Sequence, residues 1–209
     1  MARSGDTIRL VELVCARLCH DLGGLIGTVG NALEMVTEDA GQDNEVVAFA
    51  ASAASALTER LRLMRTAWGP ETEAMKLPAL VALVAPAVAV RRIGIDARAL
   101  RPDCVFRPAF ARVVLNLIVL ACDCMPKGGT IVLMGGPDDL LVRIDGPDAA
   151  WPAGFTDCMR DEDTALAAVT GARSVQMPLT VLFALSRQLR LSPVLGPTSG
   201  MEAVRLSPA

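Results

Sequence analysis

The sequence predicts an α+β protein, in which an N-terminal antiparallel helical hairpin precedes a small α/β sandwich. Apolar residues recur with helical period through roughly the first third of the chain, and shorter helical and alternating runs follow. A length of 209 residues, with 52% hydrophobic and 21% charged content, allows one large domain or two small ones. We expect the hairpin to occupy residues 1–70 and the sandwich residues 75–209, joined by a linker from Gly69 to Met75.

The first helix is predicted to begin at Asp6, a residue type that commonly caps helices, and to run for seven turns. Gly41, Asp43 and Asn44 then interrupt the helical pattern. The apolar positions that define this helix are Leu10, Val14, Leu18, Leu22, Leu25, Val29, Leu33 and Val36.

A second helical pattern ends at Gly69 and Pro70, a pair that stops helices. Its apolar positions are Val46, Ala50, Ala53, Leu57, Leu61, Met64 and Trp68. Two amphipathic helices of this length leave one side of each apolar stripe exposed when they pack only against each other. We therefore expect a homodimer, in which two hairpins form a four-helix bundle.

The rest of the chain predicts shorter helices and strands in alternation. Helices are expected at Leu77–Arg91, Pro108–Met125, Glu162–Val169 and Val175–Leu191. Strands are expected at Ile93–Ala97, Thr130–Met134, Leu140–Ile144, Pro193–Leu195 and Ala203–Leu206.

Composition excludes several classes of partner. A net charge of −3 and only seven aromatic residues provide neither a basic nor a stacking surface for nucleic acid. The longest apolar runs, Leu77–Val90 and Val113–Met125, are interrupted and fall short of the roughly 20 residues that cross a membrane.

The first residues, Met1–Asp6, do not lead into a secretion-signal pattern. None of the six cysteines forms a Cys-x-x-Cys pair. We therefore expect a cytoplasmic protein with reduced cysteines.

His20 is the only histidine, so any imidazole chemistry must use it, and a multi-histidine metal site within one chain is excluded. At about 100° per residue, His20 lies roughly opposite the apolar stripe of its helix. Gly23, Gly24, Gly27 and Gly30 project from the same side. Because each glycine inside a helix costs about 0.8–1 kcal/mol relative to alanine, we interpret them as clearing space for a docking protein. A helix that is irregular at the glycines is the alternative.

The neighbours of His20 favour phosphoryl chemistry. Arg17, one turn earlier, is expected to attract a phosphoryl or carboxylate group. Asp21 is expected to hydrogen-bond one ring nitrogen, which leaves the other nitrogen nucleophilic. A Cys19–His20 nucleophile and base is the hydrolytic alternative, although adjacent helical residues point about 100° apart. The residues that we expect to contact the docking protein are Arg17, Gly23, Gly24, Gly27 and Asn31.

The segment Arg17-Leu18-Cys19-His20-Asp21-Leu22 resembles the phosphoacceptor segment of bacterial histidine phosphotransferases of the ChpT type. These proteins look like histidine kinases whose ATP-binding domain has decayed, and the resemblance covers nearly the whole chain. It implies that His20 is the phosphorylated histidine, that Asp21 orients the imidazole and that Arg17 lies at the docking surface. It also implies that residues 75–209 form a degenerate histidine-kinase ATPase domain of the Bergerat type.

Three departures from kinase motifs predict that nucleotide chemistry is lost. The segment that begins at Asn116 is similar to the kinase N-box, but Leu120 stands where a second asparagine would bind Mg²⁺. Pro147 and Ala149 replace the two glycines of the loop around adenine. Residues 172–195 contain no glycine, so the glycine-rich lid over the phosphates is missing.

The resemblance implies a phosphorelay function. His20 would accept a phosphoryl group from the receiver aspartate of a hybrid histidine kinase and pass it to response regulators. The chain would need no cofactor of its own, because the receiver domain supplies Mg²⁺, and the C-terminal domain would form a second wall of the docking site. A non-catalytic dimeric scaffold that docks response regulators and an unusual, ATP-binding histidine kinase are the two alternatives.

Overall fold

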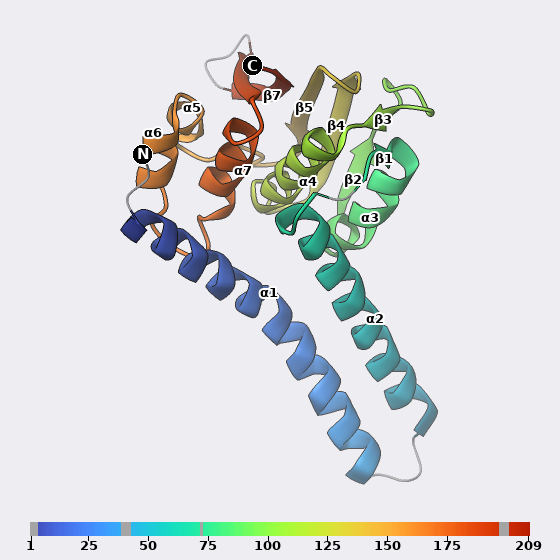
Figure 1. Cartoon of the computed structure of the whole chain (residues 1–209). Coiled ribbons are helices and arrows are strands. Elements are labelled where there is room, and N and C mark those ends of the chain that lie inside the picture. The colour runs from blue at the N-terminus through green and yellow to red at the C-terminus, as the bar shows by residue number, and fades with distance from the viewer. Residues whose placement is uncertain (1–3, 39–42, 72, 197–200) are drawn as a thin grey trace.

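The computed structural model describes residues 4–38, 43–71, 73–196 and 201–209, and it confirms the predicted α+β fold class. Two long helices open the chain, α1 (Ser4–Glu38) and α2 (Asp43–Trp68). Figure 1 shows them running antiparallel, close together at their connected ends and diverging toward the remaining domain. The apolar period of each helix accounts for this pairing, because it places one continuous stripe against the other helix.

The ends of these helices differ from the prediction. Helix α1 begins at Ser4, so Asp6 is not the cap but lies in the first turn, where a carboxylate favours the free N–H groups. Helix α2 begins at Asp43, so Asp43 and Asn44 start a helix instead of interrupting one, and Gly41 lies outside the described residues. Helix α1 is continuous through its glycines, which excludes the irregular alternative.

The C-terminal region contains two short strands, a five-stranded sheet and several helices. In chain order these are β1 (Met75–Lys76), α3 (Leu77–Val90), β2 (Ile93–Asp96), β3 (Val105–Phe106), α4 (Pro108–Asp123), β4 (Gly129–Gly135), β5 (Leu140–Asp145), α5 (Phe155–Cys158), α6 (Glu162–Ala167), α7 (Gln176–Leu185), β6 (Leu189–Leu195) and β7 (Met201–Pro208).

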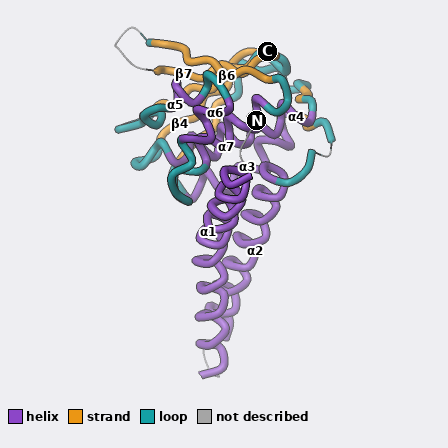
Figure 2. Tube along the Cα trace, turned by 60° about the vertical axis from the view of Figure 1, so that its left-hand side comes forward, coloured by secondary structure: helices purple, strands orange, loops and turns teal. Residues whose placement is uncertain are grey.

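The main sheet has the strand order β2-β4-β5-β7-β6. Its β2 and β4 strands are parallel, and the remaining neighbours are antiparallel. Figure 2 shows the strands at the end of the molecule away from the hairpin, with helices on the side toward it. Side chains that alternate along the central strands, including Ile131, Leu133 and Val142, are fully buried in the core. The result is a two-layer α/β sandwich.

The largest error in the predicted elements lies after α7. The helix predicted over Val175–Leu191 ends at Leu185, and Leu189 already belongs to β6. Gln188 adopts a left-handed backbone with φ of 54°, which turns the chain into the strand. The prediction also missed β1, β3 and α5, which are only two to four residues long.

Helix α4 lies at the centre of the core, and almost all of its side chains are buried. The same core cluster includes Leu63 and Ala67 from the end of α2, so this end of the hairpin packs directly into the C-terminal region. None of the helices in the described ranges is long and apolar enough to cross a membrane.

Candidate functional site

His20 lies near the middle of α1 with its imidazole directed to solvent. The side chain is 67% exposed, as its position on the helix predicted. An exposed neutral imidazole carries an accessible nitrogen lone pair, which makes it a competent nucleophile near neutral pH. The chemistry available at this position is therefore attack on an electrophile that a partner brings.

The glycines beside His20 have no packing role within the chain. A Cβ atom built on Gly23, Gly24, Gly27 or Gly30 meets nothing within 4 Å. These positions are exposed, and so is Asn31. Since no group among the described residues requires a small residue there, the open surface is consistent with close approach of another molecule.

A cleft of about 370 Å³ adjoins His20. Its walls come from α1, α2 and α3, and they combine apolar side chains with two arginines, Arg60 and Arg91. Val90, at the end of α3, is 85% exposed beside it. The sequence did not predict this cleft, because no local pattern indicated that α3 would pack beside the middle of α1. Its lining residues are His20, Asp21, Leu25, Ala56, Glu59, Arg60, Leu63, Leu83, Pro86, Ala87, Val90 and Arg91.

Asp21 lies beside the imidazole, as expected. Its Oδ1 atom is 3.4 Å from Nδ1 of His20, and its Oδ2 atom accepts hydrogen bonds from Arg17 at 3.0 Å and Arg60 at 2.7 Å. Burial alone would raise the pKa of Asp21, but the hydrogen bonds from Arg60 and Arg17 outweigh burial and hold the pKa below its ordinary value. Asp21 is therefore held as a carboxylate, with one oxygen 3.4 Å from Nδ1 of His20.

Arg17 is not at the docking surface, contrary to the expectation. The residue is only 6% exposed, and its guanidinium donates to Asp21, to Asp123 and to the carbonyl oxygen of Arg173. Helical spacing correctly placed Arg17 one turn from His20 but gave no sign of the C-terminal groups that bury it. Within the described residues, Arg17 is linked to His20 through its hydrogen bond to Asp21.

The segment similar to the kinase N-box is closed off from solvent. Asn116 is fully buried, and its Nδ2 donates to the carbonyl oxygens of Ala67 at 2.8 Å and Arg112 at 2.9 Å, while its Oδ1 accepts from Gln176 at 2.9 Å. Leu120 is 3% exposed and belongs to the apolar core. Asn116 therefore joins the last turn of α2 to α4. The apolar side chain of Leu120 fills the position where the N-box has its second asparagine.

The segment at the position of the kinase adenine loop, residues 145–149, is shaped by contacts and backbone conformations within the chain. A Cβ atom on Gly146 would lie 2.5 Å from the carbonyl oxygen of Gly128, so the glycine allows two turns to approach each other. Asp148 adopts a left-handed backbone with φ of 59°, next to Pro147, which has no backbone N–H to offer a ligand. Gly146, which precedes the replaced position Pro147, thus serves chain packing.

A family model and a curated relative both indicate a histidine phosphotransferase. A family model for the histidine phosphotransferase C-terminal domain matches residues 70–197, which is more than half of the chain. The protein phosphotransferase ChpT of Brucella abortus is 34% identical over 64 residues, a stretch that covers 31% of this chain and 30% of that protein's length.

One solved structure shows the same fold over nearly the whole chain. A bacterial phosphotransferase matches with a TM-score of 0.71 and 21% identity, over 99% of this chain and 97% of the other. The cytoplasmic segment of the histidine kinase QseC matches with a TM-score of 0.40 and 14% identity, over 76% of this chain and 93% of the other. Because the family model spans β1 to β6, the assignment applies to most of the C-terminal region. The chain belongs to the histidine phosphotransferase family.

Proposed function

We propose that His20 carries the phosphoryl group in a relay that does not use ATP. The group would come from the receiver aspartate of a hybrid histidine kinase and pass to the receiver aspartates of response regulators. The observation that carries the proposal is the single histidine of the chain, exposed beside a cleft and next to a carboxylate that contacts its Nδ1 atom. A chain with no second histidine offers no other imidazole for this chemistry.

The transfer step needs little from this protein beyond position. The Nε2 lone pair attacks the phosphorus of the aspartyl phosphate, the N–P bond forms as the P–O bond to the aspartate breaks, and a free carboxylate leaves. The proton on Nδ1 stays in place, and the Asp21 carboxylate stabilises the positive charge that develops on the ring. The reverse sequence of bonds returns the group to another receiver, because phosphohistidine is itself an energetic donor.

The partner would supply Mg²⁺, and the chain would hold no cofactor of its own. Phosphoryl transfer depends mainly on positioning and on cations that neutralise the transferred charge. The structure supports the loss of nucleotide binding by the burial of Leu120 and by the internal hydrogen bonds of Asn116. A carboxamide whose oxygen is fully buried and accepts a hydrogen bond from Gln176 is not available to a metal ion.

We propose that the receiver docks on the glycine side of α1 and on the exposed end of α3. The open positions at Gly23 and Gly27 permit close backbone approach, and the apolar side chains around Val90 provide the second wall of the cleft. Replacing Gly27 with glutamine, whose side chain projects into this space, should raise the KM for the phosphorylated receiver about tenfold and leave kcat unchanged.

A second copy of the chain would cover the remaining apolar surface of the hairpin. Ile8, Val11, Ile26 and Leu33 of α1 are each more than half exposed, and Phe49 of α2 is 57% exposed. A row of large apolar side chains at helical spacing is stabilised when another helix packs on it. We therefore propose a homodimer with a four-helix bundle, acting in the cytoplasm where its signalling partners reside.

The test mixes the purified protein with a receiver domain labelled on its aspartyl phosphate. We expect acid-labile, base-stable label on the wild type, and a loss of at least about 10³-fold in His20→Gln, whose exposed side chain leaves the fold intact. Cys19→Ser, at the neighbouring exposed position, is the matched control and should transfer normally.

The remaining results decide between the alternatives. Label that appears after incubation with ATP and Mg²⁺ alone identifies an active kinase. Receivers that bind the protein but never label it identify a scaffold. Loss of transfer in Cys19→Ser, with His20→Gln active, identifies the cysteine as the nucleophile.

A further inference from the structure

Arg17 is a buried cation on a helix that is otherwise largely exposed. Only 8% of its side chain is exposed to solvent. Its Nε donates to Oδ2 of Asp21 at 3.0 Å, its Nη2 to Oδ2 of Asp123 at 3.0 Å, and its Nη1 to the carbonyl oxygen of Arg173 at 3.2 Å. The planar guanidinium has donors on separate edges and so joins two carboxylates at once, which the single ammonium of lysine does less well.

The two carboxylates belong to different regions of the chain. Asp21 follows His20 on α1 and also binds Arg60 of α2 at 2.7 Å. Asp123 is the last residue of α4 and also binds Arg91 at 3.1 Å. A continuous series of ion pairs therefore leads from the C-terminal region, through Arg17, to the carboxylate that contacts the imidazole.

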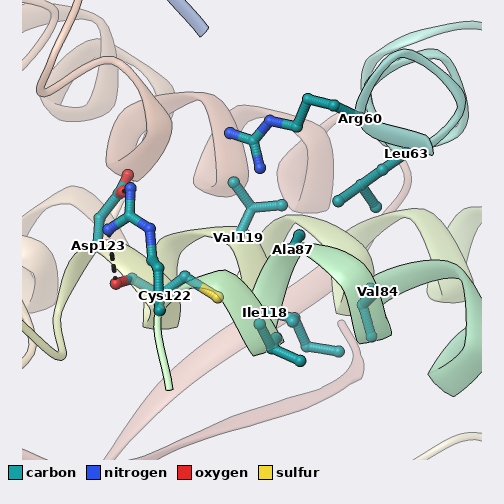
Figure 3. A pocket seen from close by; sticks show the side chains of 10 residues that line it. Arg60, Leu63, Val84, Ala87, Ile118, Val119, Cys122 and Asp123 are labelled. Carbon is teal, nitrogen blue, oxygen red and sulfur yellow. Dashed lines mark hydrogen bonds and ion pairs between the residues drawn. The ribbon is translucent and has the colours of Figure 1, made fainter. Parts of the chain in front are cut away.

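The junction that carries Asp123 is closely packed. A crevice of about 10 Å³ lies between α2, α3 and α4, roughly the space that one water molecule needs. Figure 3 shows Arg60 and Asp123 at this junction, with Val119 and Ile118 among the apolar side chains that fill it. Arg91 also donates to the carbonyl oxygen of Cys122 at 3.0 Å, which fixes the end of α4 that carries Asp123.

We propose that Arg17 and Asp123 are positioning residues, through which the C-terminal region fixes the Asp21 carboxylate against Nδ1 of His20. The proposal rests on the proposed function and deepens it, because it gives the degenerate ATPase domain a part in preparing the nucleophile. With Asp21 held in place, the proton stays on Nδ1 and the lone pair on Nε2. Neither Arg17 nor Asp123 touches the reacting atoms.

A network that only anchors the hairpin would show the same ion pairs but would not influence the imidazole. The two roles differ in the tautomer of His20, which ring-nitrogen NMR measures directly. Since His20 is the only histidine, protein labelled with ¹⁵N-histidine gives signals from one imidazole. At about pH 8.5, where an ordinary imidazole is neutral, we expect the Nδ1–H tautomer to predominate in the full-length wild type.

Asp123→Asn is the main variant, because it keeps the shape of the side chain and removes its charge. We expect the Nδ1–H tautomer to fall below half of the population, while circular dichroism shows a folded protein. Arg17→Lys should shift the tautomer in the same direction, and Asp123→Glu, which keeps a carboxylate, should restore most of the wild-type ratio. Asp103→Asn, in an exposed ion pair with Arg101, is the matched control and should leave the ratio unchanged.

Transfer kinetics provide the second readout. In Asp123→Asn we expect kcat for transfer from a phosphorylated receiver to fall about tenfold, with KM little changed, because the receiver still docks on the same surface. If folded Asp123→Asn and Arg17→Lys both keep the wild-type tautomer ratio, the positioning role is wrong and the network is only an anchor. If the tautomer shifts but the wild type accepts no phosphoryl group, the positioning role stands and the proposed relay function is wrong.

Discussion

The His20 segment of α1 resembles a phosphoacceptor segment and the Asn116 segment of α4 resembles the kinase N-box, yet the surroundings of His20 and Asn116 are opposite. His20 is 67% exposed beside glycines that touch nothing, whereas Asn116 is fully buried and hydrogen-bonded to three residues of the same chain. The imidazole of His20 is accessible to a partner. The carboxamide of Asn116 instead joins α4 to α2 and α7, so this motif residue has a structural role within the chain.

The largest expected effect is at Leu120, and it tests whether the Asn116 segment of α4 is closed to nucleotide. Leu120→Asn restores the missing asparagine of the N-box, but it removes an apolar side chain from the core and buries an amide without partners. We expect a loss of about 4 kcal/mol in the free energy of unfolding, measured with urea, and no ATP binding by calorimetry.

Leu120→Met is the control for that substitution, because it keeps the apolar volume and should cost less than about 1.5 kcal/mol. A Leu120→Asn protein that keeps its stability and binds ATP would show that the site is open, and the contrast between the two segments would then be lost.

A smaller effect is expected at Asn116 itself. Asn116→Ala leaves the buried carbonyl of Ala67 with a single longer hydrogen bond from Arg112, at 3.3 Å, and removes the shortest hydrogen bond that Gln176 donates, at 2.9 Å. We expect a loss of about 2 kcal/mol in the free energy of unfolding. Asn31→Ala makes the same change on the exposed side of α1 and should alter stability by less than about 0.5 kcal/mol. Equal effects at the two positions would contradict the contrast.

The smallest expected effect has the opposite sign. Gly27→Ala adds a methyl group where nothing lies within 4 Å, so we expect the helix to gain about 0.8–1 kcal/mol, seen as a higher Tm. Gly128→Ala is the control: φ there is +81° and a Cβ atom would lie 2.6 Å from the carbonyl oxygen of Arg92.

We expect Gly128→Ala to lose about 2 kcal/mol. If Gly27→Ala instead destabilises the protein in solution, this side of α1 is covered by a second copy of the chain and is not free for receivers.

Local patterns were sufficient to predict most of the fold. The helical period placed α1 and α2 correctly to within a few residues, and the ranges predicted for α3 and α4 were equally close. The end of α7 was wrong because the apolar period continues into Leu189 and Leu191, and the turn depends on the left-handed backbone of Gln188. A single residue in a left-handed conformation leaves no periodic pattern in the sequence from which it could be predicted.

The sequence predicted only those parts of the candidate site that lie within one helix. His20, Asp21 and the glycines belong to one helix, so helical geometry placed them correctly relative to one another. The burial of Arg17 and the contribution of Arg60 depend on α2 and α4 packing beside α1, which is decided by tertiary contacts far apart in the sequence. An arginine at helical spacing looks the same whether it faces solvent or a buried carboxylate.

The position of His20 along α1 has a consequence for the order of events in the proposed relay. At a rise of about 1.5 Å per residue, His20 lies roughly 24 Å from Ser4 and roughly 27 Å from Glu38. A folded domain about 30 Å across, centred on the imidazole, therefore covers most of that face. Donor and acceptor receivers compete for the same place, so transfer would follow ping-pong kinetics, in which the phosphohistidine must outlive the departure of one partner and the arrival of the next.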